Sequence, residues 1–185
     1  MQNLNLGLLA HVDAGKTTLS ENILYTSGAI RNLGRVDHKD TYLDNFEMEK
    51  ERGITIFSKQ ARFTYCGKDF TLLDTPGHVD FSSEMERVLS VLDMAVLIVS
   101  APEGVQSHTR TLWKLLEHYE IPTFIFVNKM DMQGADRDAV LAEIKSILGK
   151  RCVDIDNDCE SALEEISSAD EGLIEEYLET GTVCD

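Results

Sequence analysis

Three things are scarce in this chain of 185 residues: long apolar runs, paired cysteines and basic side chains. No apolar stretch approaches the ~20 residues that a helix needs to cross a bilayer, and the start Met1-Gln2-Asn3 does not resemble a signal sequence. The four cysteines lack the paired spacing of metal sites, which favours free thiols in a reducing cytoplasm. With 43% hydrophobic and 27% charged residues, the composition is typical of a globular domain.

The excess of acidic over basic residues is concentrated toward the C-terminal end. The whole chain carries a net charge of −16, and residues 131–185 hold 16 acidic and 4 basic side chains, a net of −12. The remaining −4 belongs to residues 1–130. Because nucleic-acid binding depends on neutralising phosphates, we expect no independent nucleic-acid binding from so acidic a surface.

Apolar patterning alternates between strands and helices along the first 150 residues. Short apolar runs typical of buried strands occur at 4–9, 70–73, 94–99 and 122–127, and an alternating strand is indicated at 61–65. Apolar residues at helical spacing occur at 19–25, 81–92, 112–119 and 140–148. Cys66-Gly67-Lys68 predicts a hairpin turn between two of the strands. This order predicts a three-layer α/β domain with a mostly parallel sheet and one antiparallel hairpin strand.

The string Ala-His-Val-Asp-Ala-Gly-Lys-Thr at 10–17 joins the first expected strand to the first expected helix. A strand, a tight loop and a helix are the context of a phosphate-binding loop, whose backbone N–H groups point at the phosphates. Lys16 would add a positive charge at the β- and γ-phosphates, and the Thr17 hydroxyl can bind Mg²⁺. The usual pattern opens with Gly, and Ala10 in its place costs little where φ is negative. The loop alone does not separate ATP from GTP. We expect the nucleotide to be bound by His11, Val12, Asp13, Ala14, Gly15, Lys16, Thr17 and Thr18.

A second polar string, Asp74-Thr75-Pro76-Gly77-His78, follows the strand expected at 70–73. Asp74 would therefore project from a strand end, where it can hold Mg²⁺ through a water. No side chain crowds the Gly77 N–H, so it can bond a γ-phosphate. His78 comes next in the sequence and would lie beside the water that attacks the γ-phosphate. The simpler alternative is that His78 is an ordinary surface histidine in a turn. The position of His78 directly after Asp-Thr-Pro-Gly argues against that alternative.

A third polar string, Asn128-Lys129-Met130-Asp131, follows the strand expected at 122–127. The Asp131 carboxylate can accept two N–H bonds from the edge of guanine, and adenine lacks that pair of donors. Asn128 would bond the other edge of the base and brace the phosphate loop, while the aliphatic part of Lys129 covers the ring. The string therefore predicts guanine as the base.

Together with Glu49-Lys50-Glu51-Arg52-Gly53-Ile54-Thr55-Ile56, these strings closely resemble the G domain of the translational GTPases, the elongation factor G group. Within that group the segments 27–30, 33–37 and 43–45 are most similar to the tetracycline-resistance ribosomal protection proteins. The resemblance implies a cytoplasmic, Mg²⁺-dependent GTPase that binds GTP and GDP and is slow until the ribosome activates it. Elongation factor G proper is the alternative within the group, and the specificity of the strings disfavours a GTPase unrelated to translation.

The resemblance also implies roles for single residues. Thr55 matches the switch I threonine whose hydroxyl reaches Mg²⁺ when the γ-phosphate is present. His78 matches the histidine that orients the hydrolytic water, so that catalysis would rest on His78, Lys16 and Gly77. Val12 and Ile54 match an apolar gate that screens this histidine. Asp13 matches a position linked to a monovalent cation near the phosphates, and a loop-capping aspartate would look the same.

The pattern changes after Gly149. We expect residues 1–150 to form the G domain and residues 151–185 to be the acidic helical part of an insert in it, so that the chain ends before the fifth motif of the family. Ser161-Ala162-Leu163 is a candidate for that motif, but 157–160 does not indicate a strand and 160–166 indicates an acidic helix. A truncated module that binds GDP or GTP weakly without significant turnover is the further alternative.

Overall fold

The structure is a computed structural model that describes residues 3–32, 59–75, 82–149, 152–156 and 162. The chain forms two compact units, residues 1–143 and residues 144–185. The strands of the first unit are β1 (Asn3–Ala10), β2 (Lys59–Tyr65), β3 (Lys68–Asp74), β4 (Met94–Ser100) and β5 (Thr123–Asn128). Its helices are α1 (Lys16–Thr26), α3 (Ser82–Leu89) and α4 (Ser107–His118), and α5 (Arg137–Ile147) begins in the first unit and ends in the second. No helix in the described ranges is long and apolar enough to cross a membrane.

The five strands form one mixed sheet in the order β2-β3-β1-β4-β5. β1 pairs in parallel with β3 and β4, and β4 pairs in parallel with β5. β2 alone runs antiparallel, paired with β3. The turn between them has φ of 48° at Cys66 and 77° at Gly67, the left-handed values of a tight hairpin turn. The predicted mostly parallel sheet with one hairpin strand is confirmed.

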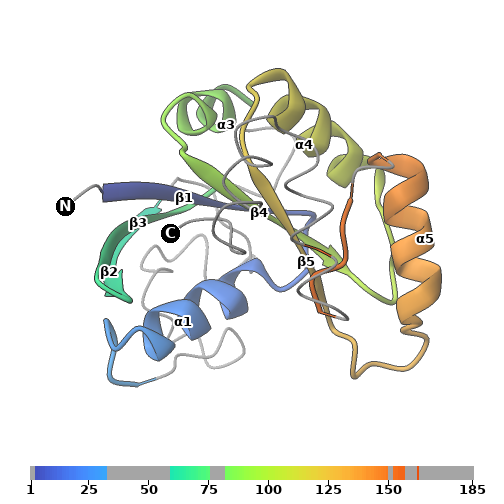
Figure 1. Ribbon diagram of the computed structural model, residues 1–185, viewed down its shortest axis with the longest axis horizontal. Helices are drawn as coiled ribbons and strands as arrows, with labels where there is room; N and C mark the ends of the chain where they lie inside the picture. Colours follow the sequence, from blue (N-terminus) through green and yellow to red (C-terminus); the bar gives the residue numbers. More distant parts are fainter. Residues whose placement is uncertain (1–2, 33–58, 76–81, 150–151, 157–161, 163–185) are drawn as a thin grey trace, which may run out of the picture. The chain divides into compact units, whose positions relative to one another are not determined.

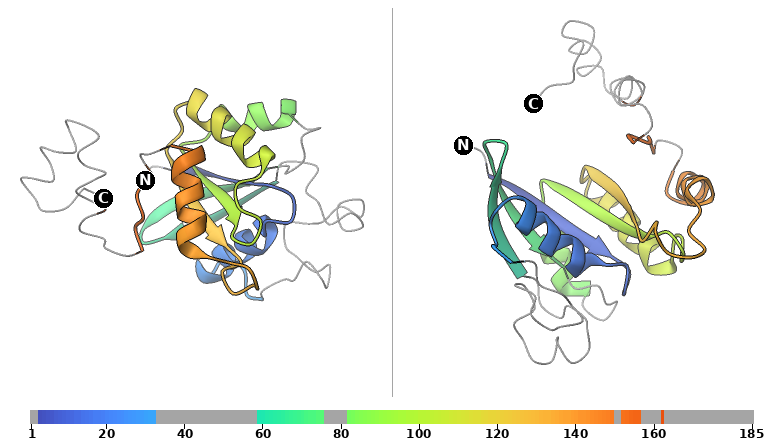
Figure 2. Two further views of the ribbon diagram at one scale, coloured as in Figure 1. Left: turned by 90° about the vertical axis from the view of Figure 1, so that its right-hand side faces the viewer. Right: turned by 90° about the horizontal axis from the view of Figure 1, so that it is seen from below.

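Helices cover both faces of this sheet, with α1 on one face and α3 and α4 on the other (Figures 1 and 2). On the α1 face, Leu6 and Leu8 of β1 pack with Leu24 of α1 and Leu72 of β3 in one buried cluster. On the other face, α4 packs against β4 and β1 and buries Leu112 and Leu116. These apolar residues recur at strand and helix spacing in the sequence, which is why the three layers could be predicted.

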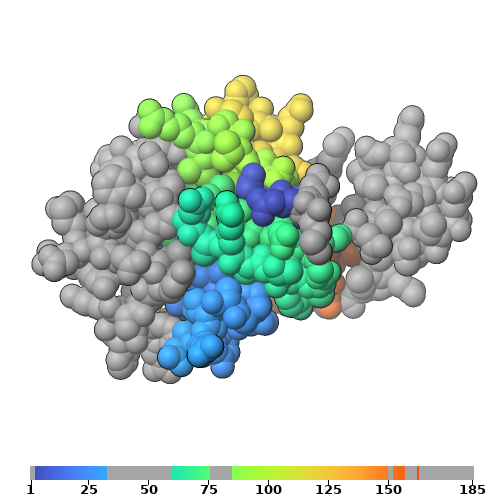
Figure 3. Space-filling view, turned by 90° about the vertical axis from the view of Figure 1, so that its left-hand side faces the viewer, coloured from blue at the N-terminus to red at the C-terminus, as the bar shows by residue number. Residues whose placement is uncertain are grey.

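The four parallel strands bring their carboxyl ends to one edge of the sheet. Residues that follow β1, β3, β4 and β5 therefore lie close together, at the position where open α/β sheets bind ligands. Figure 3 shows the opposite side of the molecule, near the amino end of β1, where the hairpin β2–β3 forms the surface between α1 and α3.

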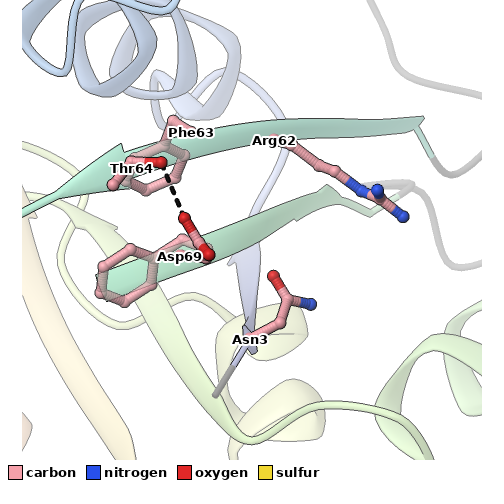
Figure 4. Close-up of a pocket in the computed structure, with 6 residues that line it drawn as sticks. Asn3, Arg62, Phe63, Thr64 and Asp69 are labelled. Atoms are coloured by element: carbon pink, nitrogen blue, oxygen red, sulfur yellow. Dashed lines mark hydrogen bonds between the residues drawn. The ribbon is translucent and has the colours of Figure 1, made fainter. Parts of the chain in front are cut away.

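A polar hollow lies at that other end of the sheet (Figure 4), and its lining residues are Asn3, Arg62, Phe63, Thr64, Asp69 and Phe70. The Thr64 hydroxyl donates to the Asp69 carboxylate over 2.8 Å, and Asn3 is the register partner of Asp69. The hollow thus belongs to the amino ends of β1 and β3. It is separate from residues 10–17, Asp74 and residues 128–131, which lie at or after the carboxyl ends of the parallel strands.

Candidate functional site

The phosphate loop connects the end of β1 to the start of α1. Ala10 is the last residue of β1 and has extended backbone, so the expectation that this position does not require glycine is confirmed. The loop turns by a hydrogen bond of 3.2 Å from the Ala14 N–H to the His11 carbonyl and by left-handed backbone at Asp13 (φ 62°) and Gly15 (φ 96°). The N-terminus of α1 follows at once, where unpaired N–H groups and the helix dipole favour an anion.

Lys16 and Asp74 form a buried ion pair between the loop and β3. The Lys16 ammonium donates to Asp74 Oδ1 over 2.6 Å, and the two side chains are only 8% and 0% exposed. Lys16 also donates to the Thr75 carbonyl. Two residues predicted to serve phosphate and Mg²⁺ are thus brought together by strands that are adjacent in the sheet.

Thr75 fixes the end of β3 to β1 and was missed by the sequence analysis. Its side chain is fully buried, and its hydroxyl donates to the Leu8 carbonyl over 2.7 Å. The sequence signal for Thr75 is its place inside the Asp-Thr-Pro-Gly string, which drew attention only to its neighbours.

The oxygen donors of Asp74 and of Thr17, the residue next to Lys16, fit Mg²⁺ chemically. The Asp74 carboxylate and the Thr17 hydroxyl offer oxygen, the ligand atom that Mg²⁺ prefers. No group of three or more His, Cys, Asp or Glu side chains that could hold a metal occurs in the described part of the chain. Mg²⁺ in phosphate-binding sites is commonly held by one or two side chains together with water and substrate phosphates.

Asn128 links the end of β5 to the phosphate loop, which confirms its predicted bracing role. Its side-chain amide donates to the Ala14 carbonyl over 2.9 Å. A Cβ atom at Gly15 would lie 2.3 Å from Asn128 Nδ2, so only glycine permits this approach. The Asn128 carbonyl also accepts from the Ala101 N–H over 2.9 Å, which ties the end of β5 to the segment that follows β4.

The residues after Asn128 form a turn at the same edge of the sheet. Lys129 has left-handed backbone with φ of 61°, and its carbonyl accepts from the Met132 N–H over 3.1 Å. Asp131 is exposed within this turn. Its carboxylate is therefore accessible to a base, as the guanine prediction requires.

Three other residues of the predicted phosphate loop differ in their exposure. Asp13 and Thr18 are exposed, and Val12 is half-buried. The rest of the expected set, Ile54, Thr55, Gly77, His78 and Ser161, lies outside the described residues.

A contact between two histidines also escaped the sequence analysis. The ring of His11 in the loop lies 6.1 Å from the ring of His108 in α4, at an interplanar angle of 55°. His11 Nδ1 is buried and has no hydrogen-bond partner among the described residues. No sequence signal could have found this pair, because the two residues are far apart in the chain and belong to no shared motif.

Comparison with known proteins agrees with the site and the fold. The chain is 51% identical over 150 residues to the tetracycline resistance protein TetP of Clostridium perfringens, which covers 81% of this chain and 23% of that protein. It is 54% identical over 148 residues to the oxytetracycline resistance protein of Streptomyces rimosus, covering 80% and 22%. It is 49% identical over 153 residues to TetO of Campylobacter jejuni, covering 83% and 24%. The chain thus spans less than a quarter of the length of these relatives.

The chain is also similar to a solved structure and matches a family of known domains. A crystal structure of a Thermus thermophilus protein superposes with a TM-score of 0.81 at 29% sequence identity, covering 95% of this chain and 33% of that one. Residues 1–182 match the family described as the Elongation factor Tu GTP binding domain. With that match added to a phosphate loop braced from β5 and an ion pair at the end of β3, the chain belongs to the Elongation factor Tu GTP binding domain family.

Proposed function

We propose that this chain is the GTP-binding and GTP-hydrolysing G domain of a ribosome-acting protein of the tetracycline-resistance ribosomal protection type. One observation carries the nucleotide part of the proposal: Lys16, Asp74 and Asn128 come from distant segments and meet around one loop. The relatives' names support the resistance part, because each is called a tetracycline or oxytetracycline resistance protein. Residues 1–150 would form the G domain, and residues 151–185 part of its insert.

The phosphates would be bound by the N–H groups of the loop and by the Lys16 ammonium. That ammonium donates to Asp74 and to the Thr75 carbonyl, which places it between the phosphate loop and the end of β3. Thr17 and Thr55, and Asp74 through a water, would hold Mg²⁺, whose chemistry is to neutralise charge on a transferred phosphoryl group.

The hydrolytic step would rest on the segment after β3. The Gly77 N–H would bond the γ-phosphate and His78 would orient the attacking water, screened until activation by Val12 and Ile54. Arg87 lies exposed in the last turn of α3 and is not placed as an arginine finger. We expect slow intrinsic hydrolysis with activation by the ribosome, because Arg87 supplies no such finger among the described residues.

Further properties belong to the same proposal. A monovalent cation near Asp13 would add positive charge beside the phosphates, and the exposed Asp13 carboxylate is accessible to it. A domain that works on the ribosome would act in the cytoplasm. Because this chain is so acidic, its affinity for the ribosome would come from protein contacts or from domains such as those that make its relatives longer.

Calorimetry with GDP, GTP and ATP in the presence of Mg²⁺ tests the nucleotide part. We expect binding of GDP and GTP and much weaker binding of ATP. Asp131→Ala should abolish this preference, because the carboxylate that distinguishes guanine is gone. Asp138→Asn, an exposed carboxylate in the first turn of α5, is the matched control and should change nothing. Equal binding of ATP and GTP by the unaltered chain would contradict the proposal.

GTP turnover tests the hydrolytic part. We expect slow release of phosphate from the chain with Mg²⁺, stimulation by ribosomes, and loss of turnover in EDTA or in the His78→Ala variant. Ribosomes carrying bound tetracycline are compared with drug-free ribosomes, since a protection protein acts on the former. Guanine-selective binding without turnover under every condition would overturn the enzymatic part and leave a nucleotide-binding module.

A further inference from the structure

We propose that His108 is a positioning residue that holds the start of the phosphate loop through its ring contact with His11. The inference rests on the proposed function, because it assumes that this loop binds nucleotide phosphates. Neither His108 nor helix α4 takes part in the nucleotide site as predicted from the motifs.

The geometry of the contact is that of an aromatic pair. Ring centroids 6.1 Å apart with an angle of 55° fall within the range in which tilted aromatic rings attract each other. His11 is the first residue after β1, and its Nδ1 is buried without a hydrogen-bond partner in the described ranges. Because no hydrogen bond at Nδ1 fixes the His11 ring among the described residues, the contact with His108 can contribute to holding that ring.

His108 is carried by an element that is well anchored. It is the second residue of α4, and its helix neighbours Thr109 and Leu112 are each only 1% exposed. The segment that leads into α4 is fixed to the end of β4 by a hydrogen bond of 2.9 Å from the Gly104 N–H to the Ser100 carbonyl. A ring that is mounted on such a helix can restrain a loop residue that touches it.

The restraint reaches the phosphate-binding backbone through His11. The His11 carbonyl accepts from the Ala14 N–H over 3.2 Å, and the Ala14 carbonyl accepts from the Asn128 amide over 2.9 Å. The loop is thus held from β5 at one end and from α4 at the other. Because ordering a loop before a ligand arrives lowers the cost of binding, loss of the His108 ring should weaken nucleotide binding.

A double-mutant cycle on GDP binding tests the proposal. His108→Ala should raise the Kd for GDP with Mg²⁺ about two- to tenfold, the value of one aromatic pair. In a His11→Ala background the same change should have no further effect, because the contact is already lost. His108→Phe restores a ring at this position and should bring the Kd back to within about twofold of the unaltered chain. The matched control is His118→Ala, an exposed histidine on the last turn of the same helix, which should leave the Kd unchanged.

Two results would overturn the proposal: an unchanged Kd in His108→Ala, or an equal loss in the presence and absence of the His11 ring. His108→Leu fills the volume without a ring and serves where His108→Ala fails to fold. If the unaltered chain binds no GDP, the proposed function fails, and the contact is then tested without nucleotide. Imidazole NMR signals of His11 should shift in His108→Phe and stay fixed in His118→Ala, and the absence of that difference would refute the contact itself.

Discussion

Asp74→Asn removes the negative charge of the buried ion pair at the candidate site. The Lys16 ammonium lies 2.6 Å from Asp74 Oδ1, and the side chains are 8% and 0% exposed. Removing one partner of a buried pair leaves the other charge uncompensated, which costs about 3–5 kcal/mol of unfolding free energy. Because the Thr75 carbonyl still accepts from Lys16, we expect the lower end of that range, about 3 kcal/mol.

Urea denaturation followed by circular dichroism measures this loss. EDTA is present and nucleotide is left out, because any ligand of the folded state would stabilise it and mask the effect. With an m value of about 2 kcal/mol/M, a loss of about 3 kcal/mol lowers the urea midpoint by about 1.5 M. Lys16→Met combined with Asp74→Asn should cost less than the two single changes together, since no unpaired charge remains.

The matched control for the ion pair is Asp69→Asn on the same strand. Its carboxylate accepts an exposed hydrogen bond of 2.8 Å from Thr64, so we expect a loss below about 1 kcal/mol. A loss of less than about 1 kcal/mol in Asp74→Asn, or one equal to the control, would refute the reasoning about the buried charge.

Three further predictions concern single residues. Thr75→Val keeps the shape but removes the buried hydroxyl donor, so the urea midpoint should report a loss of about 1–2 kcal/mol, and an unchanged midpoint would contradict the role of this bond. Gly15→Ala places a Cβ against the Asn128 amide at φ of 96°, and calorimetry should show GDP binding weakened about tenfold or more, whereas a Kd within about twofold would contradict it. Burial raises the pKa of the Cys152 thiol, so iodoacetamide at pH 8 should label it more slowly than the exposed Cys66, as mapped by mass spectrometry; equal rates would contradict this.

The strands and the mostly parallel character of the sheet could be predicted because short apolar runs of strand length alternate with segments of helical periodicity. The ends of the helices were predicted less accurately. The apolar spacing predicted a helix over 81–92, but α3 ends at Leu89. Leu92 lies beyond the helix and packs so closely against β1 that a Cβ atom on Gly7 would come within 2.4 Å of it. The apolar spacing indicates that Leu92, which is half-buried, packs against the sheet, but it does not show that the helix has already ended.

The candidate site divides in the same way. Lys16, Asp74 and Asn128 could be named from the sequence because each follows a strand within a string of known chemistry. The direct ion pair, the Thr75 hydroxyl on β1 and the ring contact of His108 could not, because they depend on how neighbouring strands and α4 are packed. Sequence motifs name residues that face a ligand, whereas packing decides which residues hold them there.

Asn128 couples the part of the site that would bind the base to the part that would bind the phosphates. The residue opens the string that would read the base, and its amide holds the loop that would hold the phosphates. The two halves of a nucleotide are then thermodynamically linked, and such linkage is reciprocal. Guanosine would raise the affinity of the chain for pyrophosphate, and pyrophosphate would raise its affinity for guanosine by the same factor.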